Sequence, residues 1–169
     1  MASAGERFKI DTKVVSFTPG SHTNARIHGS INTSLKLLKT SAVNVEYLHV
    51  PDRDTPFAET LEAMDQAHQS GKFEAFGLSN YTAAEVEEIV KICDEKRFVK
   101  PTVYQGQYNA IVRSGEQELF PVLRKHGIAF YAWRSGHSHS VYMEPVSDNF
   151  EQSGRRGSIR REPQKCQGW

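Results

Sequence analysis

The sequence lacks the features that mark several large classes of protein. Its two cysteines, Cys93 and Cys166, are far apart and show neither CxxC spacing nor a histidine at metal-ligand spacing. No apolar run approaches the ~20 residues that a membrane-spanning helix needs. Residues 1–7 lack the apolar stretch of a secretory signal. These absences argue against a disulfide scaffold or a membrane protein, and they predict a soluble, cytoplasmic protein with free thiols.

An excess of charge of one sign is also missing. The 21 lysines and arginines nearly balance the 20 aspartates and glutamates, so the chain has no strong positive field to attract nucleic acid. We therefore expect no nucleic-acid partner. The 169 residues, of which 38% are hydrophobic, suffice for one main domain with a core of ordinary size.

Glycine-rich phosphate-binding loops are absent as well, since neither GxGxxG nor GxxxxGK[ST] follows any expected strand. Short runs rich in β-formers nevertheless alternate with helical patterns, which indicates βα units and a parallel sheet. The expected strands cover residues 9–14, 43–50, 73–79, 102–107 and 128–133. Because the phosphate loops of open nucleotide-binding sheets are missing, we favour a (β/α)8 barrel over a doubly wound sheet.

The first two expected helices lie between these strands. In the first, the apolar residues Ile27, Ile31, Leu35 and Leu38 follow one another at helical spacing. The second is predicted to start at Thr55, to have Pro56 at its first helical position, and to end near Gly71.

The other two expected helices carry start signals. Thr82 followed by Glu85 predicts a capping box at the start of the third helix. Ser114 followed by Gln117 predicts a second capping box, and Pro121 is expected to bend or interrupt the fourth helix before it stops at Gly127.

Five strands and four helices make less than a complete barrel, which normally needs ~250 residues. The predicted fold class is therefore α/β, an incomplete (β/α)8 TIM barrel of about five parallel strands and four helices. We divide the chain into a flexible N-terminus (1–8), the partial barrel (9–133) and a polar, basic tail (134–169). The tail is expected to be disordered because its composition buries too little apolar surface.

Polar residues follow the expected strands where a parallel barrel places its reactive groups, at the carboxyl ends. They are Lys13, His49, Ser79, Asn80 and Gln105. Each has an ordinary alternative: a solvated lysine, a structural histidine, a Ser-Asn turn before a helix, and a buried hydrogen-bonding glutamine. Their shared position favours a functional site more than any one of them does.

Six segments resemble, in order and spacing, the aldo-keto reductase family, and in particular its aflatoxin aldehyde reductase-like branch. The resemblance covers residues 9–133, roughly three quarters of the chain. The segments are Ile10-Asp-Thr-Lys13, Tyr47-Leu-His-Val-Pro-Asp52, Gly71-Lys-Phe73, Gly77-Leu-Ser-Asn-Tyr81, Pro101-Thr-Val-Tyr-Gln-Gly-Gln-Tyr-Asn109 and Glu118-Leu-Phe-Pro121. The resemblance implies a (β/α)8 enzyme that reduces aldehydes and ketones with NADPH.

The resemblance also implies roles for the catalytic candidates. Such enzymes use a tetrad of Asp, Tyr, Lys and His, in which a lysine ammonium stabilises the phenolate of the tyrosine that protonates the developing alkoxide. Lys13 matches this lysine, and His49 matches the histidine that orients the substrate carbonyl. No metal is implied.

Four further residues match positions that hold the cofactor. Ser79, Asn80 and Gln105 match those that bind the nicotinamide carboxamide. Trp133 falls where the family has an aromatic ring stacked on the nicotinamide, and tryptophan preserves that stacking.

The chain also departs from the family pattern. The Asp and Tyr of the tetrad belong to a strand before the one that carries Lys13, and only twelve residues precede Lys13 here. Tyr47 is not expected to replace the acid, because it lies two residues before His49 and so ~7 Å deeper. After Trp133 the sequence Arg134-Ser-Gly-His-Ser-His139 replaces the family's continuation, and the units that bind the 2′-phosphate of NADPH are missing.

Two functional hypotheses remain. The first is a carbonyl reductase by descent, represented by an incomplete, truncated copy that acts on small carbonyl compounds. The alternative is an inactive barrel remnant that serves as an interaction or structural protein and forms oligomers through exposed strand edges. A barrel enzyme with unrelated chemistry is disfavoured, since nothing else explains the ordered match.

Two motifs in the tail carry weaker signals. His137 and His139 have no third ligand at a defined spacing, so a polar loop is favoured over a metal site. Arg155-Arg-Gly-Ser-Ile159 has the form that basophilic kinases accept, although a solvated basic tail is the favoured interpretation.

Overall fold

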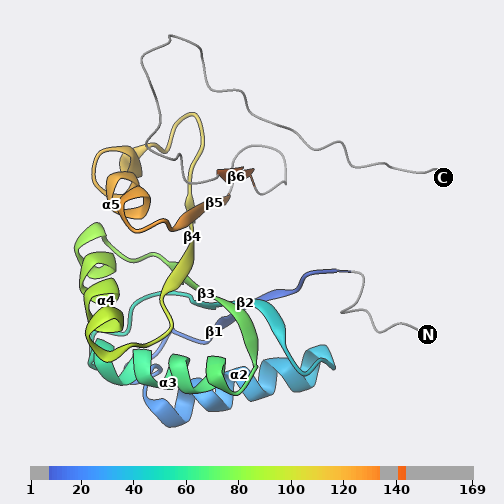
Figure 1. Cartoon of the computed structure of the whole chain (residues 1–169). Coiled ribbons are helices and arrows are strands. Elements are labelled where there is room, and N and C mark those ends of the chain that lie inside the picture. Colours follow the sequence, from blue (N-terminus) through green and yellow to red (C-terminus); the bar gives the residue numbers. More distant parts are fainter. Residues whose placement is uncertain (1–7, 134–140, 144–169) are drawn as a thin grey trace, which may run out of the picture.

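The computed structural model describes residues 8–133 and 141–143, in which strands and helices alternate along the chain (Figure 1). The strands are β1 (Asp11–Val14), β2 (Val43–Leu48), β3 (Phe73–Ser79), β4 (Pro101–Gln107), β5 (Ala129–Trp133) and β6 (Val141–Met143). The helices are α2 (Asn24–Leu38), α3 (Phe57–Gln69), α4 (Ala83–Lys96), α5 (Leu119–Lys125) and the short 3-10 helix η1 (Ser114–Glu116).

All the described strands belong to one sheet, in the order β1-β2-β3-β4-β5-β6. The first five strands are parallel to one another, as βα units require. The carboxyl ends of these five strands therefore lie at the same edge of the sheet. This arrangement confirms the predicted α/β fold, a partial barrel of five parallel strands and four helices.

The two faces of the sheet differ. On the outer face, a large apolar cluster joins the sheet to all four helices, with Ile31, Met64, Ile89 and Leu123 among its members. On the inner face, Val45, Tyr47 and Val103 form a small cluster of their own. The outer face is the main core, and the inner face remains available for a site.

Helix α4 begins as its sequence predicts. The Thr82 hydroxyl accepts a hydrogen bond from the backbone N–H of Glu85 at 3.2 Å, and the Glu85 carboxylate accepts one from the Thr82 N–H at 2.8 Å. Two backbone donors that the helix leaves unpaired are thus satisfied by a reciprocal pair.

The predicted start of the second helix is shifted by one residue. Helix α3 begins at Phe57, and Pro56 is its N-cap instead of its first helical residue. The Thr55 hydroxyl donates to the Asp52 carboxylate at 2.8 Å, which holds Thr55 in the preceding loop.

The predicted capping box at Ser114 and Gln117 is wrong. Ser114 lies in η1, and α5 begins only at Leu119. Pro121 therefore occupies the first turn of α5, where its missing N–H has no intrahelical partner to lose. Helix α5 therefore continues through Pro121 from Leu119 to Lys125 without interruption.

The described part of the chain extends beyond the last strand that the sequence predicts. Strand β6 pairs antiparallel with β5, with Val141 opposite Ala132. Three residues are too few for a clear alternation pattern. Residues 1–7, 134–140 and 144–169 lie outside the described residues, as do His137, His139, the 155–159 motif and Cys166, so the division of the chain into three regions stays a prediction.

Two searches of the described residues bear on the class of protein. None of their helices is both long and apolar enough to cross a lipid bilayer. Among the same residues, no group of three or more His, Cys, Asp and Glu side chains is placed to hold a metal ion. Cys93 is a free, buried thiol.

Glu46 is an unusual residue of the core. It alternates with Val45 and Tyr47 along β2 and so lies on the helix-covered face, where it is fully buried. Neither of its carboxylate oxygens has a hydrogen-bond partner among the described residues. Burial raises the pKa of Glu46 to about 8, because a carboxylate is poorly solvated there. At neutral pH this side chain is therefore mostly protonated in the folded protein.

We expect the contribution of Glu46 to stability to fall as the pH rises from about 4.5 to about 8. In this window the unfolded chain has already released the Glu46 proton and the folded chain still holds it, so ionisation favours unfolding. The cost should reach about 3 kcal/mol at pH 7. Glu46→Leu should remove it and raise the urea midpoint at pH 7, whereas Glu74→Leu, at an exposed position on β3, should not. Equal midpoints for wild type and Glu46→Leu would contradict this account.

Candidate functional site

The central contact of the site joins two residues that are 92 positions apart. The Lys13 ammonium donates a hydrogen bond to the amide oxygen of Gln105 at 2.6 Å. β1 and β4 are separated in the sheet by two strands, and three inter-strand spacings span ~14 Å on a flat sheet. Their side chains meet because the sheet curls, as in a barrel, and brings the inner ends of Lys13 and Gln105 together.

The surroundings of Lys13 control its charge. Its side chain is half-buried, and its Nζ lies 5.1 Å from the centroid of the Tyr47 ring. Burial lowers the pKa of Lys13, and the nearby Asp11 carboxylate opposes this effect. The hydrogen-bond acceptor is a neutral amide, so the ammonium gains little there to offset its desolvation.

Tyr47 lies level with Lys13 in the sheet register, one residue before the end of β2. Its ring packs against Gly77, where an added Cβ would come within 2.3 Å of the ring. Its hydroxyl is buried and has no hydrogen-bond partner among the described residues. Burial, with smaller effects from Asp11 and Tyr131, raises the pKa of Tyr47 well above its usual value. Tyr47 is therefore a poor proton donor.

His49 lies directly after β2 at the carboxyl edge of the sheet. Its ring meets the edge of the Phe17 ring at a centroid distance of 5.0 Å. Burial and, to a smaller extent, the charge of Lys13 lower the pKa of His49. The imidazole is thus mainly neutral at pH 7, with one N–H available as a hydrogen-bond donor.

Asn80 connects the ends of β2 and β3. It adopts a left-handed backbone conformation, with φ of 63°, which asparagine tolerates better than most residues. Its side-chain amide donates to the His49 carbonyl at 2.8 Å and to the Ser79 hydroxyl at 3.1 Å. Asn80 thereby fixes the backbone on which the His49 ring is mounted.

The remaining predicted residues lie along the same edge. Ser79 pairs in register with Gln105, so their side chains are neighbours on β3 and β4. Trp133 lies level with Gln107 and is 56% exposed. The structure therefore brings five predicted residues close together, namely Lys13, His49, Ser79, Asn80 and Gln105. Trp133, level with Gln107, lies two residues beyond Gln105 along the strand direction.

A second polar network supports this edge, and sequence reasoning did not find it. One Asp52 carboxylate oxygen accepts from the His22 N–H at 3.0 Å and from the Thr55 hydroxyl at 2.8 Å. Burial alone would raise the pKa of Asp52, yet its hydrogen bonds hold it below the usual value. Asp52 thus ties the loop that carries Phe17 to the loop after β2.

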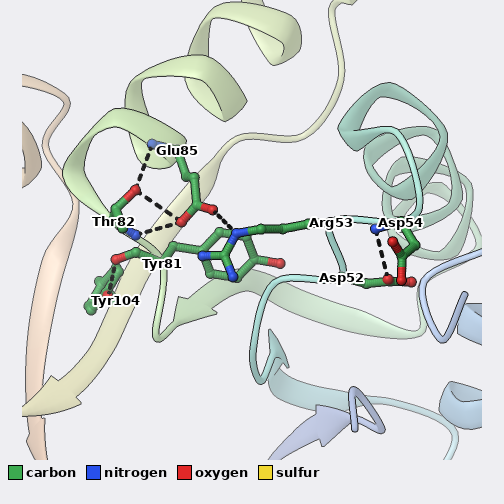
Figure 2. A network of polar contacts seen from close by, with 7 residues as sticks. All are labelled: Asp52, Arg53, Asp54, Tyr81, Thr82, Glu85 and Tyr104. Atoms are coloured by element: carbon green, nitrogen blue, oxygen red, sulfur yellow. Dashed lines mark hydrogen bonds and ion pairs between the residues drawn. The ribbon is translucent and has the colours of Figure 1, made fainter. Parts of the chain in front are cut away.

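Figure 2 shows how this loop also reaches α4. Arg53 extends to the Glu85 carboxylate, where the closest atoms are 2.8 Å apart. Nearby, the Tyr104 hydroxyl donates to the Tyr81 carbonyl at 2.6 Å, which joins β4 to the segment before α4. Asp52 belongs to the Tyr47–Asp52 segment of resemblance, but nothing in the sequence pattern indicates this role.

The family follows from comparison with known proteins. Residues 2–149 match the family model described as the aldo/keto reductase family. The chain belongs to this family.

Individual relatives place it within the family. It is 50% identical over 127 residues to aldo-keto reductase family 7 member A3 of Homo sapiens, which covers 75% of this chain and 38% of that protein. It is 46% identical over 125 residues to aflatoxin B1 aldehyde reductase member 2 of Rattus norvegicus, covering 74% of this chain and 34% of that protein. The predicted aflatoxin aldehyde reductase-like branch is confirmed.

A fungal relative matches more of the chain. An aldo-keto reductase of Pseudocercospora fijiensis is 37% identical over 163 residues, which cover 90% of this chain and 54% of that protein. The chain thus spans from about a third to about half of the length of these relatives. This aldo-keto reductase chain is an oxidoreductase by family.

We expect Lys13→Met to raise the pKa of His49 in this aldo-keto reductase chain. Removal of a nearby positive charge makes the imidazolium easier to form. An NMR titration of the His49 ring protons would measure the change. Lys36→Met, which alters an exposed lysine on α2, serves as the control and should leave His49 unchanged. A His49 titration identical in both variants would show that the two side chains are not electrostatically coupled.

Proposed function

We propose that this site belongs to the NADPH-dependent reduction of aldehydes and ketones to alcohols. The observation that carries the proposal is the Lys13–Gln105 hydrogen bond. It joins a candidate catalytic residue to a candidate cofactor-binding residue on the inner face of a curled parallel sheet. Carbonyl compounds of small size are the proposed substrates, and the cytoplasm is the proposed location.

The residues near the carbonyl group have distinct proposed tasks. His49, neutral at pH 7, donates its ring N–H to the carbonyl oxygen and orients the substrate. Lys13, when protonated, stabilises negative charge that develops on a neighbouring phenolate. Tyr47 does not supply that phenolate, since its pKa is raised. In this proposal His49 is the orienting group and Lys13 the electrostatic group, and Tyr47 is not the proton donor.

The residues along the carboxyl edge suit the nicotinamide group. The Ser79 hydroxyl and the Gln105 amide are neighbours in register and offer the donors and acceptors that a carboxamide needs. Asn80 would hold this edge in place, and Trp133 would stack on the ring. When bound, NADPH supplies the hydride; the residues of this chain only hold and orient it.

We expect the 169-residue chain by itself to reduce a reactive aromatic aldehyde no faster than background. Without a positioned acid, a contribution of typically ~10²–10⁴-fold is lost. The loss of NADPH absorbance would be followed for the wild type and for His49→Ala, with His126→Ala as a matched histidine control. A clear rate that His49→Ala abolishes and His126→Ala retains would show that some residue of this chain donates the proton.

A second candidate function rests on the open edge of the sheet. β1 is an edge strand, and the edge that faces away from β2 pairs with no other strand among the described residues. Phe8 and Val15, which flank β1 in sequence, are 71% and 62% exposed. An edge of this kind can pair with a strand of another chain, as expected of an inactive remnant that acts as an interaction protein. An NADPH titration separates the two functions, since only the reductase requires affinity for the cofactor.

A further inference from the structure

Lys13 differs from three surface lysines that form ion pairs with carboxylates. Lys91 pairs with Glu95, Lys100 with Asp94, and Lys125 with Glu87. Lys13 instead donates to the neutral amide of Gln105. The carboxylate closest in sequence, Asp11, accepts a hydrogen bond from the Asn44 side chain at 2.8 Å. Among the described ion pairs, Lys13 takes part in none.

The position of Lys13 makes its neutral form more favourable than the neutral form of a solvated lysine is. The side chain is half-buried on the inner face, with the Tyr47 ring below it and His49 close enough to feel its charge. Burial lowers its pKa, although Asp11 opposes the effect. A lysine in such surroundings is a free amine for a larger fraction of time, and a free amine is a nucleophile.

We propose that the Lys13 amine forms a reversible imine with aldehydes that reach the carboxyl edge of the sheet. The inference rests on the proposed function only in that carbonyl compounds reach the site. The lysine nitrogen attacks the carbonyl carbon, and a proton passes from nitrogen to oxygen to give a carbinolamine. Loss of water then forms the C=N bond, with no change in oxidation state. His49 lies close enough to Lys13 for the lysine charge to lower the pKa of its ring, and its imidazole can carry the proton.

The test traps the imine in the full 169-residue chain, without NADPH. The protein would be incubated at pH 7 with benzaldehyde and sodium cyanoborohydride, which reduces an imine to a stable secondary amine. Peptide mass spectrometry then gives the rate of benzylation of each lysine. Lys13 should be labelled at least about five-fold faster than Lys125, since burial without a carboxylate partner favours Schiff-base chemistry. A Lys13 rate no higher than that of Lys125 would overturn the proposal.

Two variants separate the proposed cause from simple loss of an ion pair. Gln105→Glu places a carboxylate at the Lys13 ammonium and should reduce Lys13 labelling to the Lys125 level. Glu87→Gln removes the carboxylate from Lys125, which is exposed, and should leave Lys125 slower than Lys13. If Lys125 became as reactive as Lys13 in that variant, the surroundings of Lys13 would contribute nothing and the proposal would fail. Because no NADPH is present, failed reductase turnover leaves this result unaffected.

Discussion

The curling of the parallel sheet is the constraint on which the rest of the structure depends. A flat sheet would hold Lys13 and Gln105 about 14 Å apart at the backbone, beyond contact with each other. The curled sheet lets them share a hydrogen bond of 2.6 Å and leaves an inner face lined by few apolar side chains. The helices leave the inner face uncovered, because they pack on the outer face of the sheet. The site thus depends on the curl of the sheet together with the loops that hold His49 and Asn80.

Much of this fold is predictable because its signals are local. The strand ends and the α4 capping box depend on alternation and on a four-residue pattern, which the chain preserves. The same pattern fails at Ser114, where a 3-10 turn precedes a helix that begins at Leu119. Strand β6 was not predictable, since three residues carry no usable period. Glu46 breaks the apolar pattern of β2 and is buried all the same, so the sheet overrides its preference for water.

The candidate site was only partly predictable, and the reason is physical. Strand ends are visible in sequence, which is why Lys13, His49 and Gln105 were found together. Their charge states are set by neighbours from other strands and loops, such as Tyr47 below Lys13 and Phe17 against His49. The sequence does not show these pairs, because they depend on register and on how tightly the sheet curls. The family resemblance supplied roles for single positions, but it did not supply their electrostatic coupling.

One lysine in this position can serve two kinds of chemistry, and its partner decides between them. Beside an anion such as a phenolate, the Lys13 ammonium gains Coulomb energy that offsets its desolvation, so it stays charged. Beside the neutral Gln105 amide that gain is small, and desolvation moves the equilibrium toward the free amine. The charge of Lys13 also lowers the pKa of His49, so a neutral Lys13 leaves a more basic imidazole. The group next to Lys13 therefore affects the protonation of His49 as well, through the charge that Lys13 carries.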